Sequence, residues 1–391
     1  MAHPMPALLL DLTHTSHTRA RTGIQRVARA LQRELGPEAV AVTHDPYQGT
    51  WRPLESWEHD NLAAGAVSEK RGARWPWTAR MRGRWRRLTG RPGRALPTEA
   101  GTGFLTAEIF SPAVGAQLPD VFPRVAIFHD AIALRFPELT PAGTVARFPA
   151  YLRELLQFDG IAAVSADSRE SLLDYWRWLS ATQTPPVLAL PLGVDPVLAA
   201  TATTAPGQAG PVVLTVGTLE GRKNHLALLE ACEQLWARGM RFELRLAGSA
   251  QAQTGRAALV RVRELQAAGR PLRYDGPLTD DAVAAAYAGC AFTVYPSLAE
   301  GFGLPVIESL AHGRPCICSA RGALGEHSRQ GGCLALDSVA ADSLAPAIAR
   351  LLAAPDELAA LSAAARARTF PTWRTYAGEL TRWMQSLPRR R

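Results

Sequence analysis

Two glutamates lie eight positions apart in the segment PSLAEGFGLPVIESLAHGRP (296–315), and their surroundings suit the binding of a sugar or a nucleotide. An apolar strand is predicted to end shortly before Glu300, and Gly301 and Gly303 then allow a ligand to approach the backbone closely. A helix is predicted to begin directly afterwards, so its free amides and the positive end of its dipole favour a diphosphate. Glu308 lies about one turn into that helix, where its carboxylate can accept hydrogen bonds from paired hydroxyl groups.

A second candidate group is cationic and follows the strand predicted over 211–217. Lys223 stands at the head of the next predicted helix, where its ammonium group can reach a phosphate. The adjacent Arg222 can bind a phosphate through two parallel hydrogen bonds. An Arg–Lys pair by itself usually lies on a solvated surface. Its position directly after a buried strand favours a binding role here.

Further candidates lie in the first half of the chain. His129 and Asp130 follow the apolar strand predicted over 124–128, at the edge of a sheet where ligands bind in α/β folds. A lone histidine is more often a core residue, so the strand-end position is what makes His129 a candidate. Gly23 directly precedes an amphipathic helix predicted over 24–35. Backbone amides at the start of that helix are available to a phosphate.

These candidates need a scaffold that brings strand ends together, and the order of the predicted elements supplies one. Short apolar runs alternate with helical segments, which is typical of parallel strands covered by helices on both faces. The predicted strands are 6–10, 39–43, 124–128, 161–165, 187–190, 211–217, 242–248, 272–276, 292–296 and 315–319. The predicted helices are 24–35, 143–157, 167–179, 224–238, 254–268, 280–288 and 305–312, with an amphipathic terminal helix within 369–387.

The chain of 391 residues is long enough for two domains. Residues 196–211 are rich in small residues and proline and lack periodicity, so they are interpreted as a linker. The sequence therefore predicts an α/β protein with an N-terminal domain over 1–205 and a C-terminal domain over 206–372. Each domain is expected to hold a doubly wound parallel sheet, and a cleft is expected at the carboxyl ends of the strands.

Composition and charge bound the class of protein. Hydrophobic residues make up 47% and charged residues 20%, ordinary values for a soluble enzyme. Neither a signal peptide nor a run of about 20 apolar residues is recognised, so a cytoplasmic protein is expected. The cysteines are odd in number and form no CxxC pair, which predicts reduced buried thiols and no zinc site or disulfide framework: Cys232, Cys290, Cys316, Cys318 and Cys333.

Residues 70–94 carry ten lysines and arginines and no acidic residue, with Trp75, Trp77 and Trp85 interleaved. Without these ten charges the formal net charge of +8 would be −2, so the basic character of the chain is local. No sustained helical or strand period is recognised in this segment. An anionic membrane surface and a solvated loop are equally good interpretations, and nucleic acid ranks third.

The segment 296–315 resembles the E-x7-E signature of the retaining GT-B glycosyltransferases called family 4. The resemblance covers nearly the whole chain and is densest from 211 to 326. It implies two Rossmann-like domains that transfer a hexose-type sugar from a UDP- or GDP-linked donor. Glu300 would hold hydroxyl groups of the transferred sugar, and Glu308 would hold the ribose hydroxyl groups.

The same resemblance implies roles for backbone groups and cations on the donor side. The amides of Phe302, Gly303 and Leu304 would contact the sugar and the phosphates. The family often has arginine where this chain has Thr218, and Arg222 would supply the phosphate contact instead. Lys223 would also reach a phosphate.

In the N-terminal domain, the segment FHDAIALRFPEL (128–139) resembles the family. This resemblance favours a role for His129 in the binding site over a role in the core. His129 would lie beside the anomeric carbon, and Asp130 near the acceptor. The amides at Gly23 would touch the diphosphate, and Leu278 would lie near the nucleobase. The resemblance also implies that the terminal helix, within 373–391, packs back on the first domain.

The chain contains no D-x-D motif and no His/Cys cluster with metal spacing, so neither a metal nor another cofactor is predicted. The leaving-group charge would then be balanced by cations and helix amides. The resemblance implies retention of configuration, and a front-face path is preferred because no covalent nucleophile is recognised.

The partners expected are the donor and a glycan or lipid-linked acceptor in polysaccharide assembly, with no nucleic acid. Two alternatives stay open: a non-catalytic scaffold that binds a nucleotide sugar, and another GT-B enzyme such as an epimerase. A dinucleotide dehydrogenase is set aside because the first predicted strand leads into LLLDLTHTSHT instead of a G-x-G-x-x-G turn.

Overall fold

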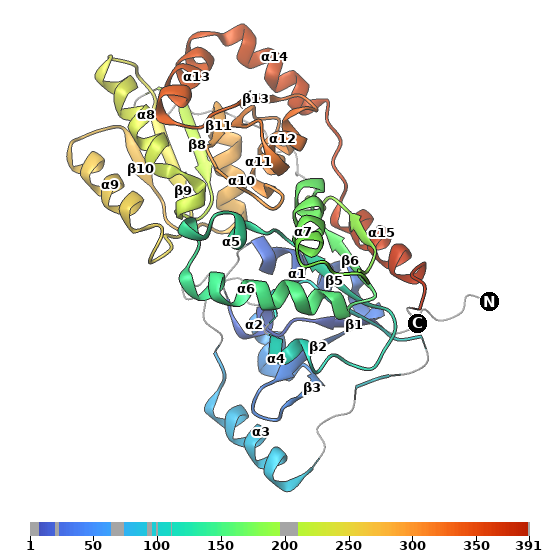
Figure 1. Cartoon of the computed structure of the whole chain (residues 1–391). Helices are drawn as coiled ribbons and strands as arrows, with labels where there is room; N and C mark the ends of the chain where they lie inside the picture. The colour runs from blue at the N-terminus through green and yellow to red at the C-terminus, as the bar shows by residue number, and fades with distance from the viewer. Residues whose placement is uncertain are drawn as a thin grey trace. The chain divides into compact units, whose positions relative to one another are not determined.

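The computed structural model describes residues 8–19, 23–63, 74–91, 96–98, 101–110, 112–195 and 210–389. Contacts divide these residues into two compact units (Figure 1). The first unit takes the described residues within Met1–Asp130, Arg147–Gly193 and Pro371–Arg391, and the second takes those within Ala131–Ala146 and Val194–Phe370. The boundary predicted at 205/206 falls outside the described residues and stays a prediction.

The first unit is built on a seven-stranded sheet of order β3-β2-β1-β4-β5-β6-β7. Six strands are parallel, as the alternation of strand and helix predicts. The edge strand β3 was not predicted and pairs antiparallel with β2, because the short turn between them leaves no room for a crossover helix. The strands are β1 (Leu8–Asp11), β2 (Ala39–Asp45), β3 (Thr50–Pro53), β4 (Gly103–Thr106), β5 (Arg124–Phe128), β6 (Gly160–Ala163) and β7 (Val187–Ala189).

The longer helices α1, α6, α7 and α15 of the first unit each bury apolar side chains. Helix α1 buries Val27, Ala28 and Leu31, which recur at helical spacing. The helices are α1 (Gly23–Leu35), α2 (Ser56–Ala63), α3 (Trp77–Thr89), α4 (Pro112–Gly115), α6 (Ala142–Glu154), α7 (Ala166–Trp178) and α15 (Trp373–Gln385). Short 3₁₀ turns are η1 (Thr15–His17), η2 (Gly36–Glu38) and η4 (Leu155–Gln157). Helix α6 begins in the second unit and ends in the first.

The second unit is built on a six-stranded, all-parallel sheet of order β10-β9-β8-β11-β12-β13. Its central strands are apolar and fully buried, as expected for strands covered on both faces. The strands are β8 (Val212–Val216), β9 (Glu243–Ala247), β10 (Leu272–Tyr274), β11 (Phe292–Tyr295), β12 (Cys316–Ser319) and β13 (Cys333–Leu336). The helices are α5 (Ile132–Arg135), α8 (His225–Ala237), α9 (Arg256–Ala267), α10 (Asp280–Gly289), α11 (Leu304–Ala311), α12 (Gly322–Ser328), α13 (Ala341–Ala353) and α14 (Pro355–Arg366), with the 3₁₀ turns η3 (Pro137–Leu139) and η5 (Gly221–Lys223).

Residues 74–91 show where the prediction of a segment without helical period is wrong. Helix α3 occupies Trp77–Thr89 and closes on Gly90, which adopts the left-handed conformation typical of a helix end. Its apolar residues do recur at helical spacing, but arginines stand between them and hide the period. Residues 70–73 and 92–94 lie outside the described residues. Among the helices of the described residues, none is both long enough and apolar enough to cross a bilayer.

The chain returns to the first unit through α15, which packs against α1 (Figure 1). The guanidinium of Arg374 lies 3.5 Å from the carboxylate of Glu34 on α1. Gly193, within the segment PLGVD (191–195), meets the start of α15. A Cβ on Gly193 would lie 2.5 Å from the backbone nitrogen of Trp373, so only glycine allows this approach.

We therefore expect Gly193→Ala to push the first turn of α15 away from the sheet and to lower the free energy of unfolding by about 1–3 kcal/mol. Urea denaturation followed by circular dichroism measures the change. Gly378→Ala, inside α15, is the matched control: among the described residues no atom beyond its own helix lies within 4 Å of the added Cβ. Equal losses in the two variants would contradict the argument.

Candidate functional site

The order of strands locates a candidate site in each unit. In the second sheet, the chain proceeds from β8 toward β9 on one side and from β11 toward β12 on the other. In the first sheet, the corresponding change of direction falls between β1 and β4. Loops diverge at such a point and leave a crevice at the carboxyl ends of the strands, where ligands bind. Candidate ligand sites are therefore formed by the loops after β8 and β11 in the second unit, and by the loops after β1 and β4 in the first unit.

In the second unit, the loops after β8 and β11 meet through a carboxylate held by two cations. The Glu300 carboxylate lies 2.6 Å from Arg222 Nη1 and 2.5 Å from Lys223 Nζ. Burial alone would raise the pKa of Glu300, but the charges of Arg222 and Lys223 outweigh it and lower that pKa to about 2. The structure thus brings together three residues predicted from separate motifs, and Glu300 is ionised at neutral pH.

Backbone contacts join the same two loops. The amide of Leu298 donates to the carbonyl of Arg222, at 2.8 Å, and Arg222 Nη1 donates to the carbonyl of Ala299, at 3.2 Å. Arg222 also pairs with Glu220, at 2.7 Å. Because the guanidinium has several donors in fixed directions, one arginine can hold the loop and still face a ligand. Thr218 lies half-buried on the same loop.

The glycine loop after β11 leads into α11 as predicted. Gly303 caps the helix with a φ of 95°, and a Cβ there would lie 2.6 Å from Leu324 Cδ2, so glycine is required on both counts. Gly301, Phe302 and Leu304 are buried beside it.

Glu308 on α11 is buried, and the hydroxyl of Tyr287 donates to its carboxylate, at 3.3 Å. The ring of Tyr287 also stacks on His312, with ring centroids 5.0 Å apart. These two aromatic side chains were not predicted. They fix the surroundings of Glu308 from α10 and from the end of α11.

Helix α12 packs against the glycine loop through His327. His327 Nε2 lies 2.7 Å from the carbonyl oxygen of Phe302, and the two rings meet edge to face, 4.6 Å apart. Burial lowers the pKa of His327 to about 4, so the ring is neutral and Nε2 carries the hydrogen that it donates. His327 was not predicted, because no local pattern connects it with the loop 25 positions earlier.

His225, the first residue of α8, was not predicted either. Its ring is buried, and neither ring nitrogen has a hydrogen-bond partner among the described residues. Burial and the nearby Lys223 charge lower the pKa of His225 to about 3. A neutral imidazole therefore lies next to the Lys223–Glu300 pair.

The segment after Asp130 belongs to the second unit, which was not anticipated. Its 3₁₀ turn η3 meets the loop after β8: a Cβ on Gly221 would lie 3.5 Å from Leu139 Cδ2. The FPE segment that follows His129 and Asp130 along the chain therefore packs beside the turn that carries Lys223.

In the first unit, His129 stands at the carboxyl end of β5, as predicted. Its Nε2 lies 2.7 Å from the carbonyl of Ala107, in the loop after β4. The hydroxyl of Ser168 donates to the backbone carbonyl of His129, at 2.7 Å. Burial lowers the pKa of His129, so the ring is neutral and Nε2–H donates, which leaves Nδ1 as the acceptor nitrogen. Asp130 follows it, half-buried.

Two buried carboxylates occupy the change of direction between β1 and β4, and neither was predicted. Glu108 accepts hydrogen bonds from the backbone amides of His14, at 2.6 Å, and Thr15, at 2.7 Å. Asp11 accepts from the hydroxyl groups of Thr13, at 2.6 Å, and Thr106, at 2.8 Å. Burial and the neighbouring Asp11 charge outweigh these donors and raise the pKa of Glu108 to about 8; burial likewise raises the pKa of Asp11.

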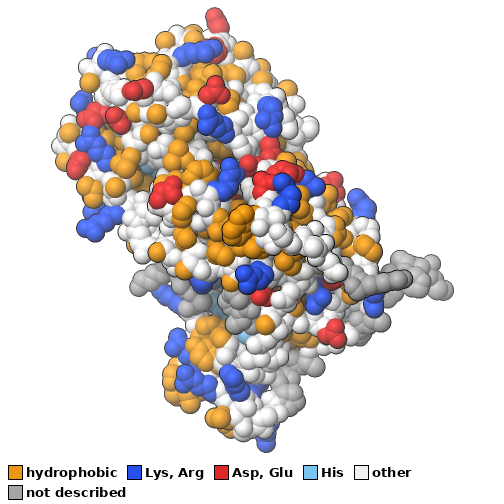
Figure 2. Space-filling view, in the orientation of Figure 1, with side chains coloured by type: hydrophobic (Ala, Val, Ile, Leu, Met, Phe, Trp, Pro, Cys, Tyr) orange, Lys and Arg blue, Asp and Glu red, His pale blue; other side chains and the backbone are white. Residues whose placement is uncertain are grey.

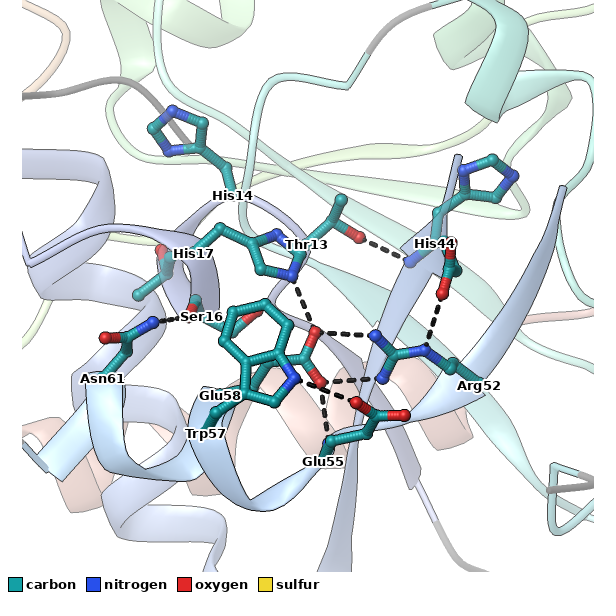
Figure 3. A network of polar contacts seen from close by, with 12 residues as sticks. Thr13, His14, Ser16, His17, His44, Arg52, Glu55, Trp57, Glu58 and Asn61 are labelled. Atoms are coloured by element: carbon teal, nitrogen blue, oxygen red, sulfur yellow. Dashed lines mark hydrogen bonds and ion pairs between the residues drawn. The ribbon is translucent and has the colours of Figure 1, made fainter. Parts of the chain in front are cut away.

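A buried ion network holds the loop after β1 against the edge of the sheet (Figure 3). Arg52 on β3 pairs with Glu58 on α2, at 2.7 and 2.9 Å, and with Asp45 on β2, at 3.0 Å. Glu58 also lies 2.6 Å from His17 Nε2. Although burial opposes it, hydrogen bonds from His17, Arg52 and the Glu55 amide lower the pKa of Glu58 to about 2.

The remaining predicted site residues are placed but not joined to these groups by a described contact. Gly23 is the first residue of α1, and residues 20–22 before it lie outside the described part of the chain. Leu278 is half-buried in the loop between β10 and α10. Their roles stay predictions.

The structure also groups three cysteines whose spacing had predicted no metal site. The sulfurs of Cys316, Cys318 and Cys333 lie within 4.8 Å of one another on the neighbouring strands β12 and β13. A structural zinc site takes four ligands, and within the described residues no His, Asp or Glu side chain joins the three. The expectation that the protein uses no metal stays a prediction.

Comparison with known families and proteins finds similarity to glycosyltransferases. Residues 210–354 match the model of the family described as glycosyl transferases group 1. The chain is 27% identical over 334 residues to the serotype-specific mannosyltransferase WbdA of Escherichia coli, covering 79% of this chain and 38% of that protein. It is 30% identical over 208 residues to the O-antigen chain mannosyltransferase B of Escherichia coli, covering 50% of this chain and 52% of that protein. This chain thus spans about half or less of the length of these relatives.

Two solved structures resemble nearly the whole chain. Anabaena Alr3699/HepE, solved in complex with UDP and glucose, has a TM-score of 0.67 at 14% identity and covers 98% of this chain and 100% of that one. Sucrose-phosphate synthase from Thermosynechococcus elongatus has a TM-score of 0.66 at 18% identity, covering 98% and 99%. At such identities the likeness concerns the fold, and it confirms the prediction of two Rossmann-like α/β units.

The buried Glu108 predicts a specific dependence of stability on pH. Because its folded pKa of about 8 lies above the ordinary value of 4.5, the folded state keeps a proton that the unfolded state loses in this window. The contribution of Glu108 to the free energy of unfolding therefore falls as pH rises from 5 to 8. Glu108→Gln removes this titration, so its stability relative to wild type should rise by at least about 1 kcal/mol over that range. Urea denaturation at both pH values measures it, and parallel pH curves would refute the assignment.

Proposed function

We propose that this chain, which belongs to the glycosyl transferases group 1 family and has the GT-B fold, transfers a hexose-type sugar from a nucleotide diphosphate sugar to an acceptor. The observation that carries the proposal is the Glu300 carboxylate between Arg222 and Lys223, at the change of strand direction and beside the start of α11. A sugar hydroxyl needs such an acceptor, and a diphosphate needs such cations. Both requirements meet at one point of the sheet.

The donor diphosphate would be bound without a metal. Lys223 and Arg222 would supply two positive charges, and the amides of Phe302, Gly303 and Leu304 would donate at the positive end of α11. Incoming phosphate oxygens would compete with Glu300 for the two cations. Glu300 would then be released toward the hydroxyl groups of the sugar that the same donor carries.

The nucleoside would lie further along the same loop and helix. Glu308 is buried on α11, four residues beyond the start of that helix, and the hydroxyl of Tyr287 donates to its carboxylate, at 3.3 Å. Ribose offers two adjacent hydroxyl groups that one carboxylate can accept. Leu278 would contact the base, and both GDP- and UDP-linked donors are consistent with these contacts.

The sugar transferred is proposed to be mannose. This rests on the relatives above, both named mannosyltransferases, of which this chain spans only part. The acceptor is proposed to be a glycan or a lipid-linked glycan in polysaccharide assembly, since one relative is named for the O-antigen chain.

The transfer is proposed to retain the anomeric configuration through a front-face path. The bond from the anomeric carbon to the β-phosphate oxygen breaks, and the acceptor oxygen bonds to the same face of that carbon. The acceptor proton moves to the departing phosphate oxygen. From the first unit, neutral His129 would orient the sugar, Asp130 would lie toward the acceptor, and the amides at Gly23 would touch the diphosphate.

The first test is donor binding by calorimetry with GDP-mannose, UDP-glucose, GDP and UDP. Glu308→Ala should weaken binding of the nucleotide and of the sugar nucleotide alike by at least about tenfold, close to 1.4 kcal/mol. Glu230→Ala, an exposed carboxylate on α8, is the matched control and should bind as wild type does. Unchanged nucleotide affinity in a folded Glu308→Ala variant would show that Glu308 does not hold the ribose.

The second test is turnover, which separates an enzyme from a nucleotide-sugar-binding scaffold. With GDP-mannose and a mannose-terminated oligosaccharide, excess EDTA should leave the rate within about twofold, because no step needs a metal. Lys223→Ala should lower the rate by at least about a hundredfold. Activity abolished by EDTA and restored by manganese would refute the mechanism, and donor binding without any transfer would favour the scaffold.

A further inference from the structure

Helix α3 exposes a continuous apolar stripe. At about 100° per residue, its four large apolar side chains fall within an arc of about 80° on the helix surface. Their exposed fractions are 73% for Trp77, 45% for Met81, 49% for Trp85 and 86% for Leu88. Figure 2 shows hydrophobic and cationic side chains side by side at the lower end of the view, where α3 lies in Figure 1.

The opposite face of α3 attaches it to the first unit. Ala79 and Gly83 are buried, and a Cβ on Gly83 would lie 2.8 Å from Tyr47 Cβ. Arg82 forms an ion pair with Glu55, at the start of α2. These contacts hold the helix on the body of the unit, so the apolar stripe points away from it.

The chain before α3 is also anchored. Trp75 packs on His17, with ring centroids 4.1 Å apart, and on Trp57, 5.7 Å apart. The Arg74 amide donates to the carbonyl of His17, at 2.9 Å. The stripe is therefore fixed to the buried ion network of the first unit.

Arginines border the stripe on one side. Arg80, Arg84 and Arg87 lie along one edge, and Arg82 lies beyond the other. No acidic residue occurs anywhere in 70–94. An apolar stripe with a cationic border and tryptophans is the pattern of a helix that lies in the interface of a membrane, with its rings at the level of the headgroups.

We propose that α3 docks the first unit onto an anionic bilayer surface, with Trp77, Met81, Trp85 and Leu88 inserted between headgroups and the bordering arginines on lipid phosphates. This goes beyond the proposed function and does not depend on it. The charges argue against a second copy as occupant, since two such helices face to face would bring their arginines together with no acid between them. The aliphatic Met81 and Leu88 argue against nucleic acid, because they offer neither charge nor stacking.

The experiment is co-sedimentation of the full chain with vesicles of phosphatidylcholine alone or with about 30% phosphatidylglycerol. Binding to the anionic vesicles should exceed binding to neutral ones by at least about tenfold and should fall as salt rises from about 0.05 to 0.5 M. Combining Trp77→Ser, Trp85→Ser and Leu88→Ser should abolish it. Combining Arg80→Ser, Arg84→Ser and Arg87→Ser should lower it by at least about tenfold.

Matched controls remove equivalent side chains elsewhere. Trp178→Ser removes a 77% exposed tryptophan on α7, and the combined Arg238→Ser, Arg256→Ser and Arg263→Ser removes three exposed positive charges. Both should bind anionic vesicles as wild type does, and thermal unfolding confirms that every variant is folded. Equal binding to neutral and anionic vesicles, no binding to either, binding that survives both α3 variants, or tight binding to single-stranded oligonucleotide instead of vesicles would each overturn the proposal.

Discussion

Parallel strands joined by crossover helices all end at one edge of their sheet, and both units of this chain depend on that constraint. It brings Glu300, after β11, to Lys223, after β8, although 77 positions separate them. It likewise brings Glu108, after β4, to the amide of Thr15, after β1. The polar groups of each candidate site are therefore set by strand order. The helices then supply what the edge lacks: amides at the start of α11 and a supporting imidazole from α12.

Three buried glutamates show how their surroundings decide their charge. Glu300 lies between two cations and Glu58 between Arg52 and His17, so both are ionised. Glu108 receives only neutral donors beside Asp11, so burial wins and it holds a proton to about pH 8. A phosphate can compete with an ionised carboxylate such as Glu300 for its cations. The contacts of Glu58 instead join α2 to β3 and to the loop after β1. Burial alone does not predict which of these glutamates is ionised, because the nearest charged groups determine whether the pKa of a buried carboxyl is lowered or raised.

The sequence predicts what is local and periodic. Most of the buried strands, the helix after Gly303 and the spacing of Glu300 and Glu308 lie within short windows, and the structure agrees with them. The buried strand β4 was not predicted. The contacts it could not predict join distant segments: Thr15 with Glu108, and His327 with Phe302. The edge strand β3 was missed because its turn carries no distinct hairpin pattern, and α3 because arginines interrupt its apolar period. The three-cysteine cluster depends on strand register, which residue spacing does not reveal.

The positive charge of the chain is divided between two environments that act differently. Arg222 and Lys223 are largely buried and already neutralised by Glu220 and Glu300, so they exert little attraction beyond their pocket. Helix α3 carries five arginines and no acidic residue, and together with the other basic residues of 70–94 they account for the basic character of the whole sequence. A field from exposed charges reaches about 8 Å at physiological ionic strength and steers encounter, whereas a neutralised pocket selects by contact. The proposed donor site therefore does not require the net charge that the sequence carries, and the proposed docking of α3 would use that charge separately.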